Sequence, residues 1–212
     1  MKLNKVLALA LSGVMAVSML AGCSGNPGNG GQEGEGETNV TGFAATVASK
    51  LDENKDNVTV TSSDTIDAAL KATMVKVADS HITGNRATAS LTKVGKSGVV
   101  FSSLDDALSD ITFSENGFTY ASKDNADEDV NRAVIYYIGG DINSDRVAQL
   151  VADEIDEIEL PERSKVNEKD GTYYAYDYTV DVSCATATTK DGTASLNYIV
   201  VVLNQNVTEH TI

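Results

Sequence analysis

The feature that most constrains the fold is the Asp191-Gly192 dipeptide, which separates two long segments of β-type sequence, 173–188 and 193–204. Asp-Gly in this setting is typical of a two-residue hairpin turn. Such a turn fixes the register, so that Lys190 opposes Thr193 and paired residue numbers keep a constant sum. The pairs predicted on one face are then all apolar: Cys184 with Ile199, Val182 with Val201, and Val180 with Leu203. Turn chemistry and hydrophobic pattern therefore predict the same antiparallel pair.

The opposite face of this hairpin differs between its two strands. On the first strand it carries Asp177, Thr179, Asp181 and Ser183, which we expect to face water. The second strand has apolar residues on both faces, because Tyr198, Val200 and Val202 occupy this one. A strand that is apolar on both sides is expected at the centre of a sheet.

Other parts of the chain give shorter strand predictions. Asn116-Gly117 predicts a second hairpin between segments 111–113 and 118–120. Segments 86–94 and 98–101 are interpreted as strands around a Gly-Lys-Ser-Gly turn. A further strand is predicted at 132–138, before Gly139-Gly140.

Two capped amphipathic helices are predicted, one beginning at Ser63 or Asp64 and one at Asn143 or Ser144, with a weaker helix at 43–51. Strands and helices alternate irregularly, which favours an α+β fold with a largely antiparallel sheet or sheets and two or three amphipathic helices. The capped helices align at an offset of 81 residues, which gives the hypothesis of a pseudo-repeat of two β-helix-β-β units. Any capped amphipathic helix would reproduce much of this similarity.

The amino terminus has the order of an export signal, with Lys2 and Lys5 before an apolar run at 6–20. The run ends in Leu20-Ala21-Gly22-Cys23, which resembles the lipobox of bacterial lipoproteins. The resemblance implies that Cys23 receives a diacylglycerol thioether and that cleavage leaves it as the mature amino terminus. It also implies lipid anchoring to a membrane of the bacterial cell envelope, outside the cytoplasm. An uncleaved signal anchor and an ordinary secretory signal are the alternatives.

These segments give an expected domain organisation. Residues 1–22 form the lipoprotein signal peptide, and 23–39 form a lipidated Cys with a flexible tether rich in Gly and Glu. Residues 40–212 are expected to form a single globular α+β domain. Once Cys23 is lipidated, Cys184 has no intrachain disulfide partner, and we interpret it as a small buried apolar residue.

The charge balance limits the partners of this domain. The chain has a net charge of −15, with two Lys in residues 1–22 and three Glu in the tether, so −14 remains on 40–212. An acidic excess of this kind argues against nucleic acid as a partner, and against a polybasic contact with an anionic membrane. The lipid on Cys23 is therefore the expected link to the membrane.

No motif for a catalytic centre or a cofactor is recognisable. His81 and His210 lack zinc-ligand spacing, and no G-x-S-x-G elbow is present. We therefore expect no cofactor and no metal. The acidic loop 124–129 is a weak calcium candidate through Asp124, Asp127 and Asp129, with a solvated loop as the alternative.

Clustered tyrosines are the most unusual feature of the domain. Tyr174, Tyr176 and Tyr178 continue the face of Val180, so the inner ones are expected in the core. Tyr173, Tyr174 and Tyr176 are the candidate binding surface for a glycan or a protein at the cell surface.

The sequence thus favours a lipid-anchored, extracytoplasmic, non-catalytic binding module whose specific role it does not reveal. Two alternatives stay open. One is the small lipid-anchored ligand receptor of a transporter, and the other is an extracytoplasmic hydrolase that uses carboxylates.

Overall fold

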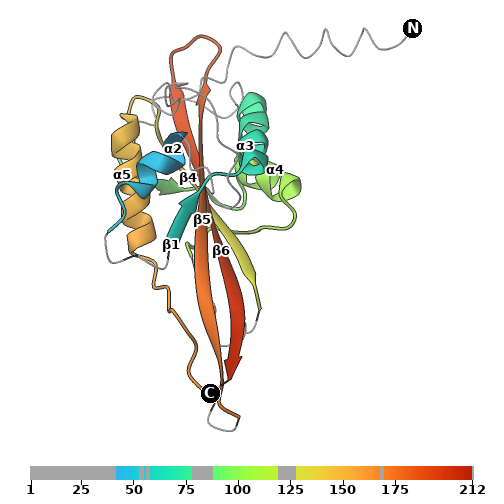
Figure 1. Cartoon of the computed structure of the whole chain (residues 1–212). Coiled ribbons are helices and arrows are strands. Elements are labelled where there is room, and N and C mark those ends of the chain that lie inside the picture. The colour runs from blue at the N-terminus through green and yellow to red at the C-terminus, as the bar shows by residue number, and fades with distance from the viewer. Residues whose placement is uncertain are drawn as a thin grey trace, which may run out of the picture.

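The computed structural model of the chain describes residues 42–52, 55, 58–77, 88–118, 128–167 and 170–211. Its centre is a six-stranded sheet in the order β1-β5-β6-β4-β2, with β3 also paired to β4 (Figure 1). The strands are β1 (Val58–Thr61), β2 (Thr92–Lys93), β3 (Thr112–Ser114), β4 (Val130–Gly139), β5 (Thr172–Thr188) and β6 (Ser195–Thr211). The helices are α2 (Gly42–Ala48), α3 (Asp64–Val77), α4 (Val99–Ala107) and α5 (Ser144–Asp156). The mixed, mostly antiparallel sheet with its helices confirms the α+β class.

The long hairpin of β5 and β6 forms with the predicted register. Cys184 pairs with Ile199, Val182 with Val201, and Val180 with Leu203. The pairing extends from Thr188 and Ser195 at the turn to Thr172 and Thr211 at the far end. Gly192 has a positive φ of 70°, which a residue without a side chain adopts at little cost. β6 lies between β5 and β4 and is central, as its two apolar faces predict.

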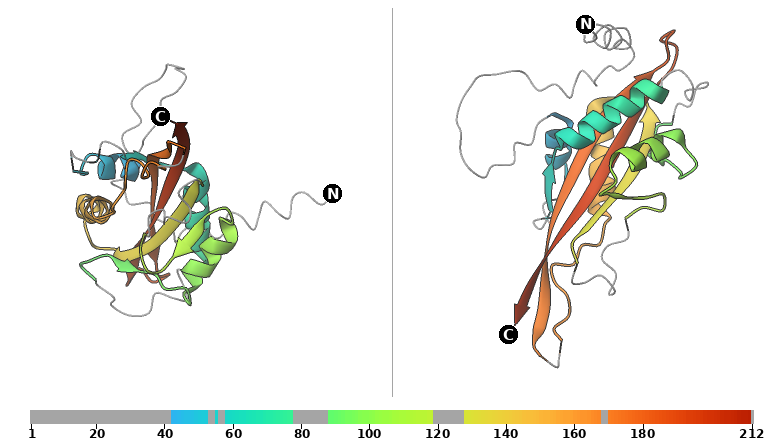
Figure 2. Two further views of the ribbon diagram at one scale, coloured as in Figure 1. Left: turned by 90° about the horizontal axis from the view of Figure 1, so that it is seen from below. Right: turned by 90° about the vertical axis from the view of Figure 1, so that its right-hand side faces the viewer.

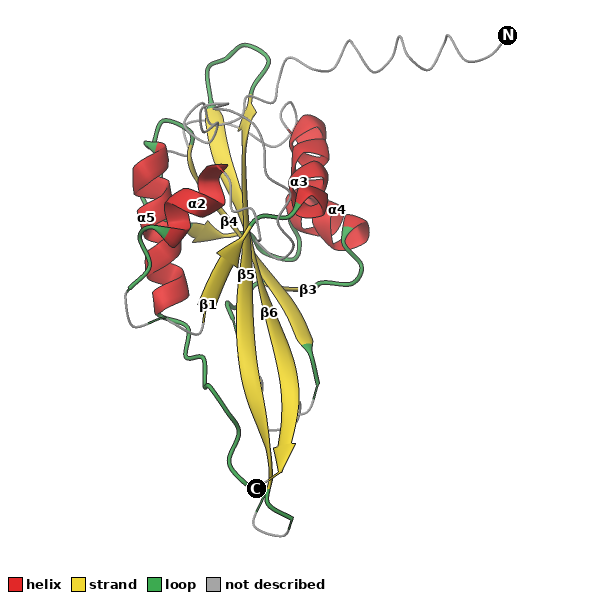
Figure 3. Ribbon diagram, viewed as in Figure 1, coloured by secondary structure: helices red, strands yellow, loops and turns green. Residues whose placement is uncertain are grey.

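One face of the sheet is covered by α2 and α5 (Figure 3). The core on this side includes Val180, Val182, Ile199 and Val201 from the hairpin. Helix α5 buries Val147, Val151 and Ile155 against it, and Asn143 caps the helix by accepting a hydrogen bond from the Asp145 amide at 2.8 Å. Both the predicted cap and the predicted apolar stripe are confirmed.

The other face is covered by α3 and α4, which corrects the expectation that this side of β5 faces water along its whole length. Tyr198, Val200 and Val202 of β6 need apolar cover, and the two helices provide it. Ser183 is consequently buried, and its hydroxyl donates a hydrogen bond to Asp67 of α3. The two helices do not cover the far part of the hairpin. In Figure 2, right, β5 and β6 run well past α3 and α4 toward the carboxyl terminus.

Two local predictions are wrong. Residues 98–101 are not a strand, because α4 begins at Val99 and turns Val100, Phe101 and Leu104 into the core. The segment before Asn116-Gly117 forms β3, which pairs in parallel with β4, and Phe118, the one described residue of its predicted partner segment, is outside any strand. Residues 119–120 of that predicted hairpin, and 86–87 of the earlier strand, lie outside the described residues.

The proposed pseudo-repeat is not seen in the described part of the chain. A strand precedes a helix in both places, as β1 before α3 and β4 before α5. However, β2 and α4 come after α3, whereas the long strands β5 and β6 come after α5, and the two helices cover opposite faces of the sheet. Of the helices described, none combines the length and apolar character needed to cross a membrane.

Candidate functional site

The residues proposed for lipidation and for calcium binding are mostly outside the described chain. Cys23, Asp124 and Asp127 belong to this group, as do the signal peptide and the tether. Asp129 is described, and its Oδ1 accepts a hydrogen bond from the Val207 amide at 2.9 Å. It therefore has a structural role at the edge of β6. Among the described residues, no three His, Cys, Asp or Glu side chains gather as metal ligands would.

The clustered tyrosines separate onto the two faces of β5. Tyr176 and Tyr178 are buried in the core beside α5, and Tyr174 is half-buried at its margin. The Tyr178 hydroxyl donates to the Pro161 carbonyl at 2.9 Å. Burial, and to a smaller extent the neighbouring Tyr176, raises the pKa of Tyr178. The inner tyrosines thus pack as expected of core residues. Tyr173, Tyr174 and Tyr176 do not share one surface, because Tyr174 and Tyr176 belong to the α5 side of the sheet.

Tyr173 points to the opposite face and has a different environment. It pairs across the hairpin with His210, and the two rings stack with centroids 5.1 Å apart and planes 16° apart. Arg163, from the segment that pairs with the other edge of β5, places its guanidinium carbon 5.9 Å from the Tyr173 ring centroid. Arg163, Tyr173 and His210 therefore form one row of side chains across three adjacent segments.

This row ends a polar surface that none of the described helices covers. Moving from it toward the helices, the next cross-strand pairs on the same face are Ala175 with Thr208, Asp177 with Asn206, and Thr179 with Asn204. The last pair continues sideways to Thr59 on β1 and Asn131 on β4. We call this surface the ribbon face; its members are Thr59, Asn131, Tyr173, Ala175, Asp177, Thr179, Asn204, Asn206, Thr208 and His210. From Tyr173 to Thr179 the surface spans six residue spacings along β5, so it is about 20 Å long.

At the end nearest the helices, the ribbon face is bounded by a small hydrogen-bonded network around Asp181. Asp181 accepts from the Thr61 hydroxyl at 2.6 Å and from the Asn204 amide nitrogen at 2.9 Å. These bonds satisfy both carboxylate oxygens of a half-buried side chain, as a buried charge requires. Asp181 is therefore used to fix β1, β5 and β6 to one another.

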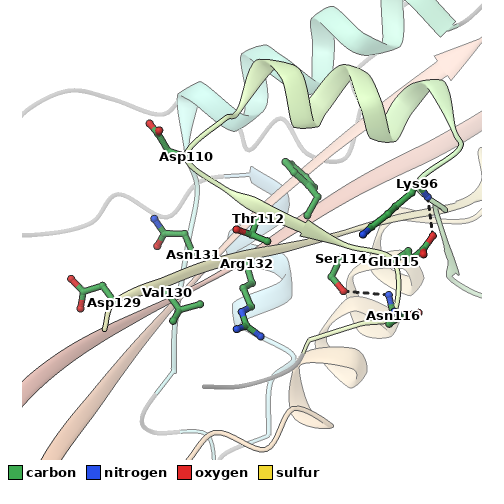
Figure 4. Close-up of a pocket in the computed structure, with 11 residues that line it drawn as sticks. Lys96, Asp110, Thr112, Ser114, Glu115, Asn116, Asp129, Val130, Asn131 and Arg132 are labelled. Atoms are coloured by element: carbon green, nitrogen blue, oxygen red, sulfur yellow. Dashed lines mark hydrogen bonds between the residues drawn. The ribbon is translucent and has the colours of Figure 1, made fainter. Parts of the chain in front are cut away.

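A groove of about 470 Å³ adjoins the ribbon face along β3 (Figure 4). Asn131 belongs to both surfaces. At one end of the groove Asn131 lies between Asp110 and Asp129, and at the other end Lys96 and Glu115 lie together, with the Lys96 amide donating to Glu115 at 3.0 Å. The lining mixes carboxylates, amides, hydroxyls and the cations Lys96 and Arg132, which suits a polar ligand better than an apolar one.

A second groove of about 320 Å³ lies on the α5 side. Its floor includes Tyr136, whose hydroxyl donates to Glu154 at 3.0 Å, and its rim includes Glu157 and Glu159. Burial, followed by the negative charge and hydrogen bond of Glu154, raises the pKa of Tyr136. The Tyr136–Glu154 bond fastens α5 to β4.

Comparison of the chain with protein-family models, with curated proteins and with solved structures gives no match.

Sequence reasoning identified Tyr173 and placed Asp177 and Thr179 on a water-facing side of the same strand, but it missed other residues of the ribbon face. Asn131 and Asn206 were not singled out, and Thr208 and His210 lay beyond the predicted end of the second strand. The signal that could have found Asn206, Thr208 and His210 was the alternation of 204–210, which continues the polar face of Asp177 when the hairpin register is extended.

Proposed function

We propose that the protein is a lipid-anchored component of the bacterial cell envelope, outside the cytoplasm, and that its folded part is a non-catalytic binding module. The lipobox-like segment at Leu20–Cys23 and the Gly- and Glu-rich tether support the anchored location. The ribbon face is the observation that supports a binding role. It is a long surface that the described helices leave uncovered, and it projects beyond both helical layers to the row of Arg163, Tyr173 and His210.

The alternative of a carboxylate-based hydrolase has less support. Hydrolysis of a glycosidic bond usually needs two carboxyl groups that face each other across the substrate. Three carboxylates line the groove beside β3, but Glu115 binds the Lys96 amide and Asp129 binds the Val207 amide. Asp110 and Asp129 also lie at the opposite end from Glu115 in Figure 4. This arrangement favours binding over acid–base chemistry.

The anchor is tested by metabolic labelling with radioactive palmitate and by phase partition in a non-ionic detergent. We expect the wild-type chain to be labelled and to enter the detergent phase. Cys23→Ala should abolish the labelling, because only a thiol at this position can form the thioether. Cys184→Ala is the matched control and should behave as wild type. Label retained in the Cys23→Ala variant would refute lipid anchoring through this residue.

A further inference from the structure

The composition of the ribbon face is unusual for β-strands. Asn and Asp are depleted in strands, because their short polar side chains compete with the backbone for hydrogen bonds. Exposed strand positions more often carry Thr or longer charged side chains. The ribbon face nevertheless places Asn131, Asp177, Asn204 and Asn206 within three neighbouring strands. Side chains that oppose local preference without a structural gain are expected at functional sites.

Structural contacts account for only part of this set. Asn204 is explained, because it donates to Asp181. Asn131, Asp177, Asn206 and Thr208 are exposed, and no hydrogen bond from the described part of the chain engages their side chains. Their donors and acceptors are thus turned outward along the ribbon.

The charge of the ribbon face narrows the class of ligand. Residues 40–212 carry a net charge of −14, which repels a polyanion. Among the ten residues of the ribbon face, Asp177 is the only Asp, Glu, Lys or Arg. Amides and hydroxyls each offer both donors and acceptors, which matches an uncharged ligand with many hydroxyl groups.

The ribbon face also lacks the apolar anchors that protein interfaces use. Such interfaces depend on a few large apolar or aromatic side chains in a desolvated centre. The exposed large apolar residues of the described chain are Val75, Val99 and Val166, and none belongs to the ribbon face. Its aromatic side chains, Tyr173 and His210, stand at one end and stack on each other.

We infer that the ribbon face binds a neutral polysaccharide chain, which lies along β5 and β6 and is hydrogen-bonded by Asn131, Asn206 and Thr208. The inference rests on the proposed binding function and names the ligand class of the same surface. Asp177 would accept hydrogen bonds from ligand hydroxyls, and the stacked pair of Tyr173 and His210 would mark the end of the site.

The test is affinity electrophoresis of the lipidated protein, purified in a non-ionic detergent, through native gels. The gels contain hydroxyethyl cellulose, glucomannan or dextran, with polygalacturonate as the anionic comparison. We expect retardation by at least one neutral polymer. The double variant Asn131→Thr with Asn206→Thr should weaken binding about tenfold, because two ligand hydrogen bonds of ordinary strength are lost. Gln149→Ala, on α5 across the sheet from the ribbon face, is the control and should bind as wild type.

The design separates a binding defect from a folding defect. Thr has a higher strand preference than Asn, so the double variant should unfold at the same temperature as wild type or higher. Unchanged binding in that variant, or retardation by polygalacturonate alone, would overturn the inference. If no neutral polymer binds but a photo-reactive group at position 206 cross-links an envelope protein, the polysaccharide inference fails and the binding module stands. If no polymer retards the protein and no envelope protein is cross-linked, both the polysaccharide inference and the proposed binding module are rejected.

Discussion

Asp129 and Val207 are joined by a side-chain-to-backbone hydrogen bond of 2.9 Å at the point where β4 stops pairing with β6. The last paired residues of the two strands are Val130 and Gln205. Beyond them, the edge of β6 continues to Thr211 without a further strand among the described residues. The Asp129 carboxylate therefore accepts the one amide hydrogen that a neighbouring strand would otherwise accept. It stabilises β6 where the two-stranded part of the β5–β6 hairpin begins.

Removal of this carboxylate should loosen the ribbon locally. We expect Asp129→Ala to increase amide hydrogen exchange at Val207 and in residues 208–211, with a local loss of about 1 kcal/mol. Asp129→Asn keeps an acceptor oxygen and should exchange nearly as slowly as wild type. Exchange of the Ile199 amide, in the middle of β6, should not change. Equal protection of Val207 in all three proteins would show that the bond does not stabilise the ribbon.

The carboxylate of Asp181 should matter more, because its surroundings are less accessible to water. Asp181→Ala leaves the Thr61 hydroxyl and the Asn204 amide without their acceptor, and an unsatisfied buried polar group costs about 1–3 kcal/mol. We expect a drop of that size in the free energy of unfolding, measured by urea denaturation. Thr61→Val together with Asp181→Ala should lose less than the sum of the single variants, since they share one interaction. If the free-energy losses of the two single variants are fully additive in the double variant, Thr61 and Asp181 do not stabilise the fold through a shared hydrogen bond.

The accuracy of the sequence predictions depended on how local each determinant was. The register of the β5–β6 hairpin was predictable to the residue because its turn and its alternation lie in one continuous segment, although β6 continues to Thr211, past the predicted end at 204. A short helical turn is predictable at 103–108, but the first turn of α4 was wrongly predicted as a strand because Val99, Val100 and Phe101 favour a strand locally. Burial of Val100, Phe101 and Leu104 against the sheet selects the helix instead. The pairing of β3 with β4 is parallel, and a parallel pair has no tight-turn signature in the sequence, so no local pattern predicts it.

The candidate site was predictable only in part for a related reason. Tyr173 attracted notice through composition, but its neighbours Arg163 and His210 come from other segments and meet it only in the folded sheet. Asn131 joins the ribbon face through the β4–β6 register, which the sequence did not fix. Alternating polar residues along one strand predict which side chains of that strand are exposed. Which exposed side chains of different strands lie together is determined only when the sheet has formed.

Close approach of two chain segments predicts a strict requirement for glycine at position 140. A Cβ atom at Gly140 would clash with the Ser195 hydroxyl and would lie 2.6 Å from its Cβ and 2.8 Å from its carbonyl carbon. We expect Gly140→Ala to lower the free energy of unfolding by about 2 kcal/mol, within the range for overpacking. Ser195→Gly in the same chain should restore part of the loss, because it removes the side-chain clash and leaves the one with the backbone. Thermal unfolding of the single and double variants measures both effects, and a Gly140→Ala chain as stable as wild type would refute the clash.

The buried phenol of Tyr136 predicts a loss of stability in alkali. Burial and Glu154 raise its pKa in the folded protein above the value of 10.0 expected for the unfolded chain. The neutral phenol is therefore favoured by folding: this stabilisation is complete below pH 10 and is lost as the pH rises above it, because the unfolded state releases the proton first. We expect the unfolding temperature of the wild-type protein to fall between pH 9.5 and 11.5, and to fall less steeply in Tyr136→Phe, which has no proton to release. Tyr173→Phe, at the exposed end of the ribbon, is the matched control and should keep the wild-type slope. Parallel curves for wild type and Tyr136→Phe would show that the phenol does not control alkaline stability.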